Sequence, residues 1–392
     1  MEEKIIDRIV IISKKLIKWA KKFKKRRYLY REIQKIDPEY FVGIKGIRGV
    51  GKTVLMLQIA GETKNSVYFS ADSSILKPFS LYEIVYSLRN RGFENVFIDE
   101  IHKRGNWQEE IKTIYDEREV RIFFSGSSAI DIVYSSTDLS RRVVLKELKP
   151  ISLREFLNIR KGFNIPVYDI KTIIKKKKDL TIKYAECIKF FEEYLEFGGV
   201  LYPKNGFYEA LDNAIRKVIV DDLSALREID VKYENNVYKF LYFIAKSHPF
   251  ETNYTKVSKF LETSKTFVIK MVEDLEKAGI IKTVFPCAKK GIDIKREPKI
   301  YLTIPIRKYF EKKGIKIEIG SLREEFFVNH FSELCYLKGK KGEKMPDFKL
   351  GDTIIEIGGV SKKRYQNPDY IAIDGLNTSE NKIPLFLFGF VY

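Results

Sequence analysis

Apolar residues near the N-terminus recur with the period of a helix. They follow one another at intervals of three or four residues: Ile5, Ile9, Ile12, Leu16, Trp19 and Phe23. This spacing predicts one amphipathic helix whose other faces carry lysines. Such a helix would pack on the next domain, lie on a membrane surface or present its charge to nucleic acid. The pattern leaves all three uses open.

Short apolar runs alternate with helical stretches from about residue 40. Five runs have the length and composition of strands: residues 40–44, 65–72, 94–100, 120–126 and 141–148. Continuous apolar strands of this kind are typical of a parallel sheet covered on both faces. The pattern therefore predicts an α/β domain, followed by a mostly helical segment.

The second half of the chain changes character twice. A helix, a turn, a second helix near 264–277 and a strand have the order of a winged helix-turn-helix, which would bind DNA or serve only as a packing module. After it come a helix at 321–337 and four strand candidates, residues 345–351, 353–359, 368–374 and 383–390. These suggest a separate α/β domain.

The chain thus divides into five predicted parts, which begin with the basic N-terminal helix. They are the basic helix at 1–31, the α/β domain at 32–150, the mostly helical segment at 151–232, the helix-turn-helix segment at 233–310 and the second α/β domain at 311–392.

Positive charge is concentrated at the N-terminus. The formal net charge is +19, and residues 1–31 contain twelve Lys or Arg against three Asp or Glu, a net charge of +9. Uneven basic charge points to an anionic partner, which is nucleic acid, lipid headgroups or an acidic protein. A solvated lysine-rich surface explains the scattered remainder equally well.

The sequence predicts a cytoplasmic protein. No stretch reaches about 18 uninterrupted apolar residues, so no transmembrane segment is expected. The three cysteines, Cys187, Cys287 and Cys335, lie far apart in the sequence. Their spacing indicates neither a zinc site nor a disulfide framework.

The strongest chemical signal is a glycine-rich turn with the pattern G-x-x-x-x-G-K-[ST]. Glycines let backbone N–H groups turn inward, and the helix that follows adds its positive dipole end. Lys52 would reach the β- and γ-phosphates, and the Thr53 hydroxyl would ligate Mg²⁺. The predicted ATP-binding loop consists of Gly46, Ile47, Arg48, Gly49, Val50, Gly51, Lys52 and Thr53.

A second signal is the apolar strand that ends in Asp99 and Glu100. Asp99 would hold Mg²⁺ through water, and Glu100 would polarise the attacking water. A later strand ends in hydroxyls, where Ser125 is the candidate to lie between the two motifs and sense the γ-phosphate. Ser127 is the alternative. The acidic pair favours ATP hydrolysis over binding alone.

Together these residues resemble the AAA+ ATPases and their signal-transduction relatives. The chain is more closely similar to an archaeal and bacterial family of predicted ATPases that end in a nuclease-like domain. The resemblance extends to residues 139–157 and 194–203. It implies a P-loop NTPase sheet with a helical lid and a candidate homo-oligomer. It also makes Arg142 the candidate arginine finger or sensor, with the adjacent Arg141 as the alternative.

Residues 345–359 resemble the restriction-endonuclease-like fold, because Pro-Asp, a turn and a Glu within an apolar strand follow one another. The resemblance implies a second metal site with Asp347 and Glu356 as ligands and Glu324 on the preceding helix.

A lysine that usually orients the attacking water is missing from this candidate second site. It belongs two residues after Glu356, where this chain has Gly358. Lys362 and Lys363 are the nearby alternatives. We therefore expect a degenerate site without efficient cleavage of nucleic acid.

Three functions remain open at this point. The first is an ATP-driven switch or remodeller that acts on nucleic acid or on a protein partner. The second is a nucleotide-regulated nuclease. The third is a non-enzymatic nucleotide-binding adaptor for protein partners.

Overall fold

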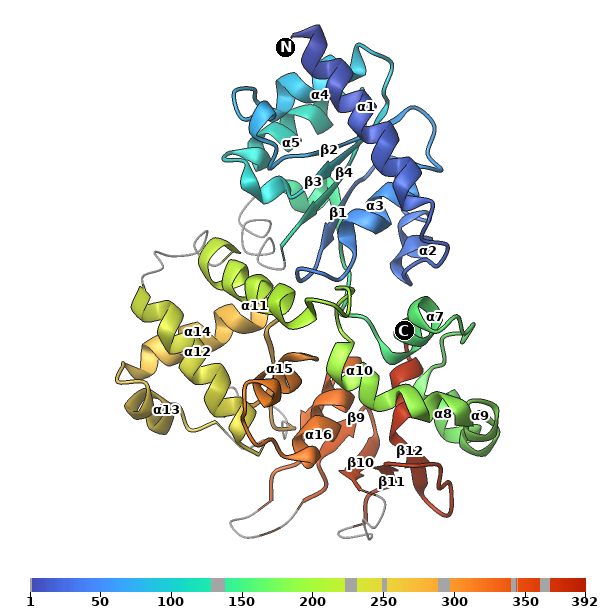
Figure 1. Cartoon of the computed structure of the whole chain (residues 1–392), viewed down its shortest axis with the longest axis vertical. Coiled ribbons are helices and arrows are strands. Elements are labelled where there is room, and N and C mark those ends of the chain that lie inside the picture. The colour runs from blue at the N-terminus through green and yellow to red at the C-terminus, as the bar shows by residue number, and fades with distance from the viewer. Residues whose placement is uncertain are drawn as a thin grey trace. The chain divides into compact units, whose positions relative to one another are not determined.

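The computed structural model describes residues 2–127, 138–222, 231–248, 252–287, 297–339, 343, 345–359 and 367–392. The chain forms two compact units, Met1–Lys149 and Pro150–Tyr392 (Figure 1). Among the described residues, no helix is both long enough and apolar enough to cross a bilayer.

The first unit is built on a five-stranded parallel sheet with the order β2-β3-β4-β1-β5. Its strands are β1 Phe41–Lys45, β2 Ser66–Ser70, β3 Asn95–Asp99, β4 Arg121–Gly126 and β5 Val143–Glu147. All five lie where the apolar runs predicted strands. The expectation of a parallel α/β sheet is therefore confirmed.

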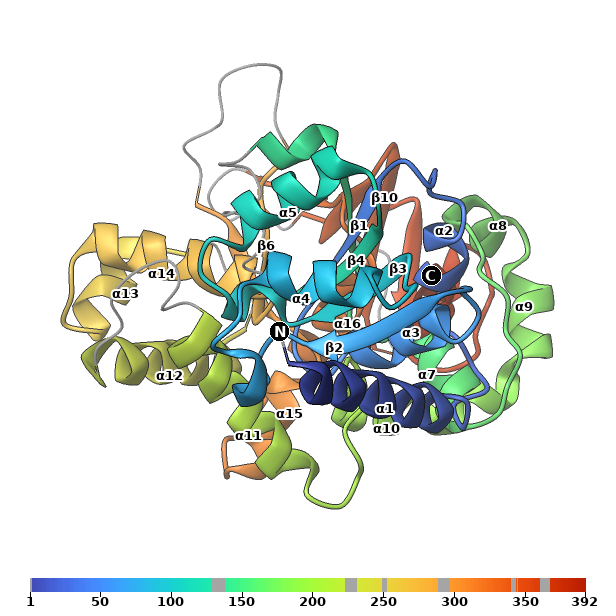
Figure 2. The same cartoon turned by 90° about the horizontal axis from the view of Figure 1, so that it is seen from above.

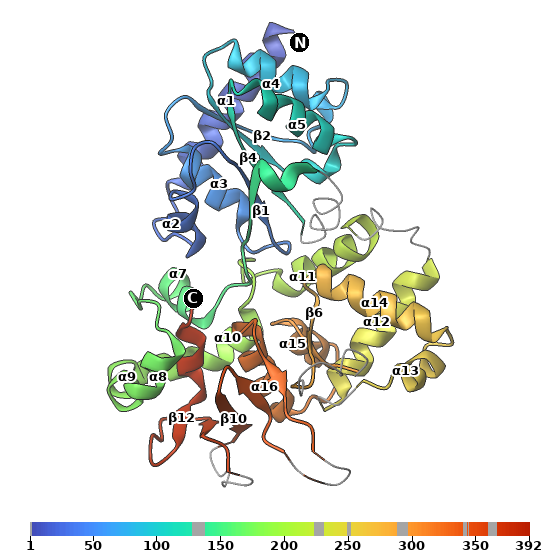
Figure 3. The same ribbon diagram turned by 180° about the vertical axis from the view of Figure 1, so that it is seen from behind.

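Helices cover both faces of this sheet. Helix α3 (Lys52–Ala60) lies on one face, and helices α4 (Leu81–Arg89) and α5 (Trp107–Glu117) lie on the other (Figures 1 and 3). Successive side chains of β3 alternate between the two cores, as Phe97 and Ile98 illustrate. This alternation explains why the strands read as continuous apolar runs.

The amphipathic helix predicted near the N-terminus is α1 (Glu3–Ala20), and it lies alongside the edge strand β2 (Figure 2). Ile6 and Ile9 are buried there, and the Tyr68 backbone N–H donates to Ser13 Oγ over 2.9 Å. The helix thus supplies a partner for a backbone group of the edge strand. A short helix, α2 (Leu29–Ile33), leads from α1 to β1.

The second unit has one hydrophobic core that joins sequence-distant segments. Its first helices are α7 Leu153–Arg160, α8 Ile170–Lys175, α9 Lys177–Lys183, α10 Phe191–Phe197 and α11 Phe207–Lys217. The later helices are α15 Ile306–Lys312 and α16 Ile319–His330. The rings of Phe191 on α10 and Phe326 on α16 have centroids 4.7 Å apart.

The sheet of the second unit has the order β12-β11-β10-β9-β8. Its strands are β8 Cys335–Tyr336, β9 Phe348–Leu350, β10 Thr353–Gly358, β11 Tyr370–Ile373 and β12 Lys382–Pro384. Helices α7 to α10 share a core with this sheet. The division of this half into three parts stays a prediction.

Between these segments lies a three-helix stretch followed by a two-stranded antiparallel sheet. Its elements are α12 Val231–Lys246, α13 Tyr254–Phe260, α14 Lys265–Lys277, β6 Ile281–Val284 and β7 Lys299–Leu302. Helix α14 coincides with the helix expected near 264–277. The order matches the winged-helix prediction, which stays a prediction as a DNA-binding assignment.

The sequence prediction of a strand at 383–390 is wrong over most of its length. Strand β12 ends at Pro384, and Leu385–Phe390 form a buried 3₁₀ helix. A short, continuous apolar run indicates a segment that is buried on all sides. Burial alone does not distinguish a strand from a tight helix.

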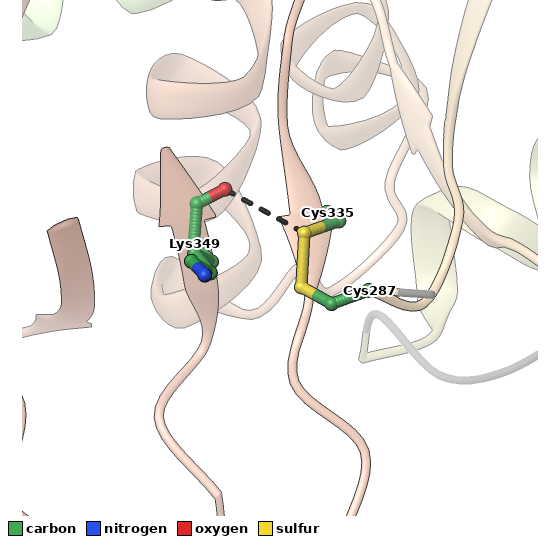
Figure 4. Close-up of a disulfide and its surroundings, with 3 residues drawn as sticks. All are labelled: Cys287, Cys335 and Lys349. Atoms are coloured by element: carbon green, nitrogen blue, oxygen red, sulfur yellow. Dashed lines mark hydrogen bonds between the residues drawn. A yellow bond between two sulfur atoms is a disulfide. The ribbon is translucent and has the colours of Figure 1, made fainter. Parts of the chain in front are cut away.

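The expectation that the cysteines form no disulfide is also wrong. Cys287 and Cys335 are joined by a disulfide (Figure 4). Pro286 and Tyr336 form a parallel bridge, and the Cys287 N–H donates to the Tyr336 carbonyl over 2.9 Å. Pairing of these two backbone segments brings the cysteines together despite their separation of 48 residues.

Candidate nucleotide-binding site

The glycine-rich loop connects β1 to α3 and turns through conformations that favour glycine. Gly49 and Gly51 have φ angles of 85° and 94°, in the left-handed region. A Cβ on Gly46 would lie 2.6 Å from the Leu148 carbonyl oxygen, so the loop passes too close to the backbone for a side chain. Helix α3 begins at Lys52, and its N-terminal N–H groups therefore lie at the end of the loop.

Lys52 is held within the loop. Its side chain is buried, and Nζ donates to the carbonyl oxygens of Gly46 at 2.7 Å and Ile47 at 3.3 Å. These bonds place an ammonium group inside the turn that the glycines form. A phosphate held by the loop would meet this charge directly.

Asp99, at the end of β3, is brought to the start of α3. Thr53 Oγ1 donates to Asp99 Oδ2 over 2.6 Å, and the Tyr68 hydroxyl donates to the same oxygen over 2.8 Å. Ser125 donates to the other oxygen, Oδ1. Asp99 is only 3% exposed, so three hydroxyls satisfy a buried carboxylate.

The hydroxyl of Thr53 and the carboxylate of Asp99 are a donor set that suits Mg²⁺, a hard cation that prefers oxygen ligands and retains water. They lie next to the loop that would hold the phosphates. The residues present therefore fit the metal that the sequence pattern implies.

Glu100 turns the chain at the end of β3. Its φ angle is 55°, a left-handed conformation that costs a non-glycine residue about 1–2 kcal/mol. Its backbone N–H donates to Asp99 Oδ1 and to Ser125 Oγ, both over 3.2 Å. Its carboxylate is partly exposed and lies 3.5 Å from His102 Nε2. The turn leaves a carboxylate open to solvent beside the buried Asp99.

Ser125 lies on the strand between the one that leads into the glycine-rich loop and the one that ends in Asp99. Strand β4 is placed between β1 and β3, and Ser125 pairs in register with Ile44. Ser127 is also buried, just beyond the end of β4. Ser125 contacts Asp99, and its role toward a γ-phosphate stays a prediction.

The structure does not bring Arg142 to the loop of its own chain. Arg142 directly precedes β5, at the edge of the sheet where the parallel strands begin, whereas the loop follows the end of β1. Its Nε lies 3.0 Å from Asp116 Oδ1. Arg141 is exposed at the end of the 3₁₀ helix Asp138–Arg141 that precedes it.

Sequence reasoning missed three residues around this site: Arg27, Tyr68 and His102. Arg27 is buried and donates to the Val50 carbonyl within the loop and to the Lys149 carbonyl at 2.6 Å. It belongs to the basic N-terminal segment, for which the sequence leaves packing, membrane contact and nucleic-acid contact open. No short sequence pattern marks these residues, because the fold brings them in from distant positions.

The three carboxylates of the predicted second site interact in the second unit. Glu324 accepts a hydrogen bond from the Tyr301 hydroxyl at 2.9 Å, and Asp347 accepts one from the Ile357 N–H at 2.7 Å. Burial, with the neighbouring Glu324 and Glu356 carboxylates, raises the pKa of Asp347 to about 8. Burial also raises the pKa of Glu324.

No group of three or more His, Cys, Asp or Glu side chains within the described residues has an arrangement that could hold a metal ion. Lys362 and Lys363 lie outside the described residues. The positive charge of Lys299, on β7, acts against the rise in the pKa of both Glu324 and Asp347.

Comparison with known proteins gives two curated relatives, both uncharacterized proteins of Methanocaldococcus jannaschii. One is 26% identical over 331 residues, which cover 77% of this chain and 70% of the relative. The other is 28% identical over 228 residues, 56% of this chain. The chain spans about half the length of this second relative, 48%.

Solved structures with similarity include the ADP complex of Hsp104 from S. cerevisiae, with 14% identity and a TM-score of 0.30 over 67% of this chain and 41% of that one. They also include AMPPCP-bound DnaA from Aquifex aeolicus, with 16% identity and a TM-score of 0.25 over 64% and 85% of the two chains. At these TM-scores the superpositions carry no argument.

The family comparison bears directly on the site. Residues 38–157 match the sequence pattern of the AAA domain family. The matched range contains the loop, the acidic pair and all five strands of the first unit. This match and the geometry around Asp99 together support an AAA+ P-loop ATPase core in this part of the chain.

Proposed function

We propose that the first unit binds Mg-ATP and hydrolyses it. The observation that carries the proposal is the 2.6 Å hydrogen bond from Thr53 Oγ1 to Asp99 Oδ2. It joins two motifs that lie 46 residues apart in the sequence. A hydroxyl and a carboxylate paired beside a phosphate loop can hold the Mg²⁺ that accompanies a nucleoside triphosphate.

Each residue has a distinct task in this proposal. The loop N–H groups and Lys52 hold the phosphates, while Thr53 and Asp99 hold the metal, which when bound neutralises phosphate charge. Glu100 orients water toward the γ-phosphate from its turn after β3. Ser125 holds Asp99 and the Glu100 N–H in place. A partly exposed Glu100 favours hydrolysis over a role as a binding-only adaptor.

The loop assignment is tested by Lys52→Ala, with Lys64→Ala as a matched control on an exposed lysine of the same unit. We expect Lys52→Ala to bind Mg-ATP at least about tenfold more weakly, because a charge-assisted contact to phosphate is lost. Titration with a fluorescent ATP analogue measures this. Equal affinity in wild type, Lys52→Ala and Lys64→Ala would remove the loop from the site.

Nucleic acid is the partner that we propose for the resulting switch, with α13 and α14 as the contacting helices. Lys256 and Lys259 on α13 and Lys265 and Lys270 on α14 are exposed. Ser264 caps α14, where its side chain accepts the Phe267 N–H over 3.1 Å. Positive charge beside a helix N-terminus favours phosphate contacts.

Salt dependence tests this partner. Duplex DNA affinity should fall steeply with salt, and Lys270→Glu should reduce the slope of log K against log[salt] by about 1. Lys312→Glu, an exposed lysine on α15, serves as the control. Absence of binding to duplex or single strands at low salt would instead favour a protein partner.

A further inference from the structure

A cavity of about 180 Å³ lies in the first unit between α1 and the segment formed by β2 and the short 3₁₀ helix η1 (Ser74–Leu76). Figure 2 shows α1 and β2 running side by side. The apolar stripe of α1 forms one wall and β2 with the residues that follow it forms the other. The principal apolar lining residues are Ile5, Ile9, Ile12, Leu16, Phe69 and Leu76.

The apolar stripe of α1 is only partly covered at this point. Ile12 on α1 and Ile75 on η1 both line the cavity, yet they are 42% and 36% exposed. The walls are therefore apolar and reachable from solvent. Cavities of this size bind small apolar molecules, since an engineered apolar cavity of about 150 Å³ takes up benzene.

The edge of the cavity carries a positive charge. Arg8 is among the lining residues and is exposed. In the part of the chain that the structure describes, its guanidinium has neither a salt bridge nor a hydrogen bond. The neighbouring acids Asp7 and Glu3 lie 3.0 and 3.7 Å from Arg91 instead. Ser70 and Ser73 add hydroxyl groups to the lining.

We propose that this cavity binds a small carboxylate with an apolar chain of about six to eight carbons, on the scale of ligands that such volumes accept. The chain lies among Ile9, Ile12 and Leu76, and the carboxylate lies against the Arg8 guanidinium. An apolar chain alone would leave that guanidinium without a partner, and a larger polar ligand would meet mostly apolar walls. Charge and lining thus select the same class of molecule.

Occupancy of the cavity is coupled to the nucleotide site through Tyr68. Tyr68 is among the lining residues of the cavity, and its hydroxyl donates to Asp99 Oδ2 over 2.8 Å. The residue after β2 is also tied to this motif, because the Ala71 N–H donates to the Asp99 carbonyl over 2.8 Å. A ligand that moves β2 therefore moves the carboxylate that would hold the metal. This coupling rests on the proposed ATPase function, whereas binding itself does not.

The test is calorimetric titration of the full chain with hexanoate, heptanoate and octanoate, without nucleotide. Affinity should rise about fourfold for each added methylene group. Ile12→Trp should fill the cavity and abolish binding, and Ile75→Trp should close it from the other wall. Ile11→Trp is the matched control, because Ile11 is exposed on the same helix but does not line the cavity.

Arg8→Gln and octanol test the charge. Arg8→Gln should weaken octanoate binding about threefold, the size of a solvent-exposed ion pair, and leave octanol binding unchanged. The proposal is overturned if wild type shows no saturable octanoate binding, or if Ile12→Trp and Ile75→Trp bind as wild type does. Binding that leaves ATP turnover unchanged would overturn the coupling through Tyr68 alone.

Discussion

Asp99 is the residue on which the first unit concentrates its polar contacts. Hydroxyls from α3, β2 and β4 reach its two oxygens through Thr53, Tyr68 and Ser125. Burial, followed by the charge of Asp99, raises the pKa of Tyr68 well above its ordinary value, so its hydroxyl remains a donor. A change at any of these positions therefore acts on the same carboxylate.

Arg142 lies at the end of the sheet where the parallel strands begin, away from the loop of its own chain, so an arginine-finger role would require the loop of a second copy. If it is an arginine finger, Arg142→Ala should lower ATP turnover by about 10³-fold and preserve ATP affinity. Adding Lys52→Ala protein, which retains Arg142, should restore turnover. A steady-state assay of the mixed variants measures this.

Asp116→Ala is the control, since it removes the ion pair with Arg142 and keeps the arginine. Wild-type turnover in Arg142→Ala would leave the residue with a structural role. The ion pair with Asp116 would then contribute about 0–1 kcal/mol to the free energy of unfolding, as surface ion pairs do.

At the scale of elements, the sequence predicted the strands that are buried on both faces of their sheet, because such strands are continuous apolar runs. Four of the five strands of the first unit lie within their apolar runs, and β1 extends one residue beyond its run, to Lys45. The same rule failed at Leu385–Phe390, where a buried 3₁₀ helix has an equally apolar sequence. The helix predicted at 321–337 is wrong over its last residues, because α16 ends at His330 and Cys335–Tyr336 form strand β8, which is too short to show a period.

The residues of the candidate site also differ in whether the sequence alone predicts them. Lys52, Thr53, Asp99 and Glu100 are found from sequence because each lies at a fixed place after a strand or within the loop. Arg27 supports the loop from a basic segment, and nothing in that segment distinguishes it from its solvated neighbours. Contacts set by tertiary packing leave no local signal.

The disulfide between β8 and the segment after β6 predicts a specific count of reactive thiols. Cys187 is fully buried, and burial raises the pKa of its thiol to about 11. Native, unreduced protein should therefore show no thiol that reacts with a chromogenic disulfide reagent at pH 8. Unfolding without reductant should expose one thiol, and unfolding after reduction should expose three.

Reduction should also lower the free energy of unfolding by about 2–4 kcal/mol, because a loop that spans 48 residues is no longer closed. Denaturant titration of reduced and oxidised protein measures the difference. Three reactive thiols in unfolded, unreduced protein would show that Cys287 and Cys335 are not paired.

At the scale of the whole molecule, the chain consists of a first unit that contains the match to the AAA domain family and a second unit that is folded around its own core. Residues 151–197 share that second core with the C-terminal sheet. The proposed lid and the C-terminal segment therefore belong to one compact unit.

Glu100→Gln tests the proposed ATP hydrolysis at the end of β3. Glu109→Gln, an exposed glutamate at the start of α5, is the matched control. Steady-state turnover and Mg-ATP affinity should be measured for both variants and for wild type. We expect Glu100→Gln alone to keep its Mg-ATP affinity and to turn over ATP at least about 100-fold more slowly, because the variant loses the contribution of a positioned base. Wild-type turnover in Glu100→Gln would contradict the proposal, as would wild-type protein that binds Mg-ATP and never hydrolyses it.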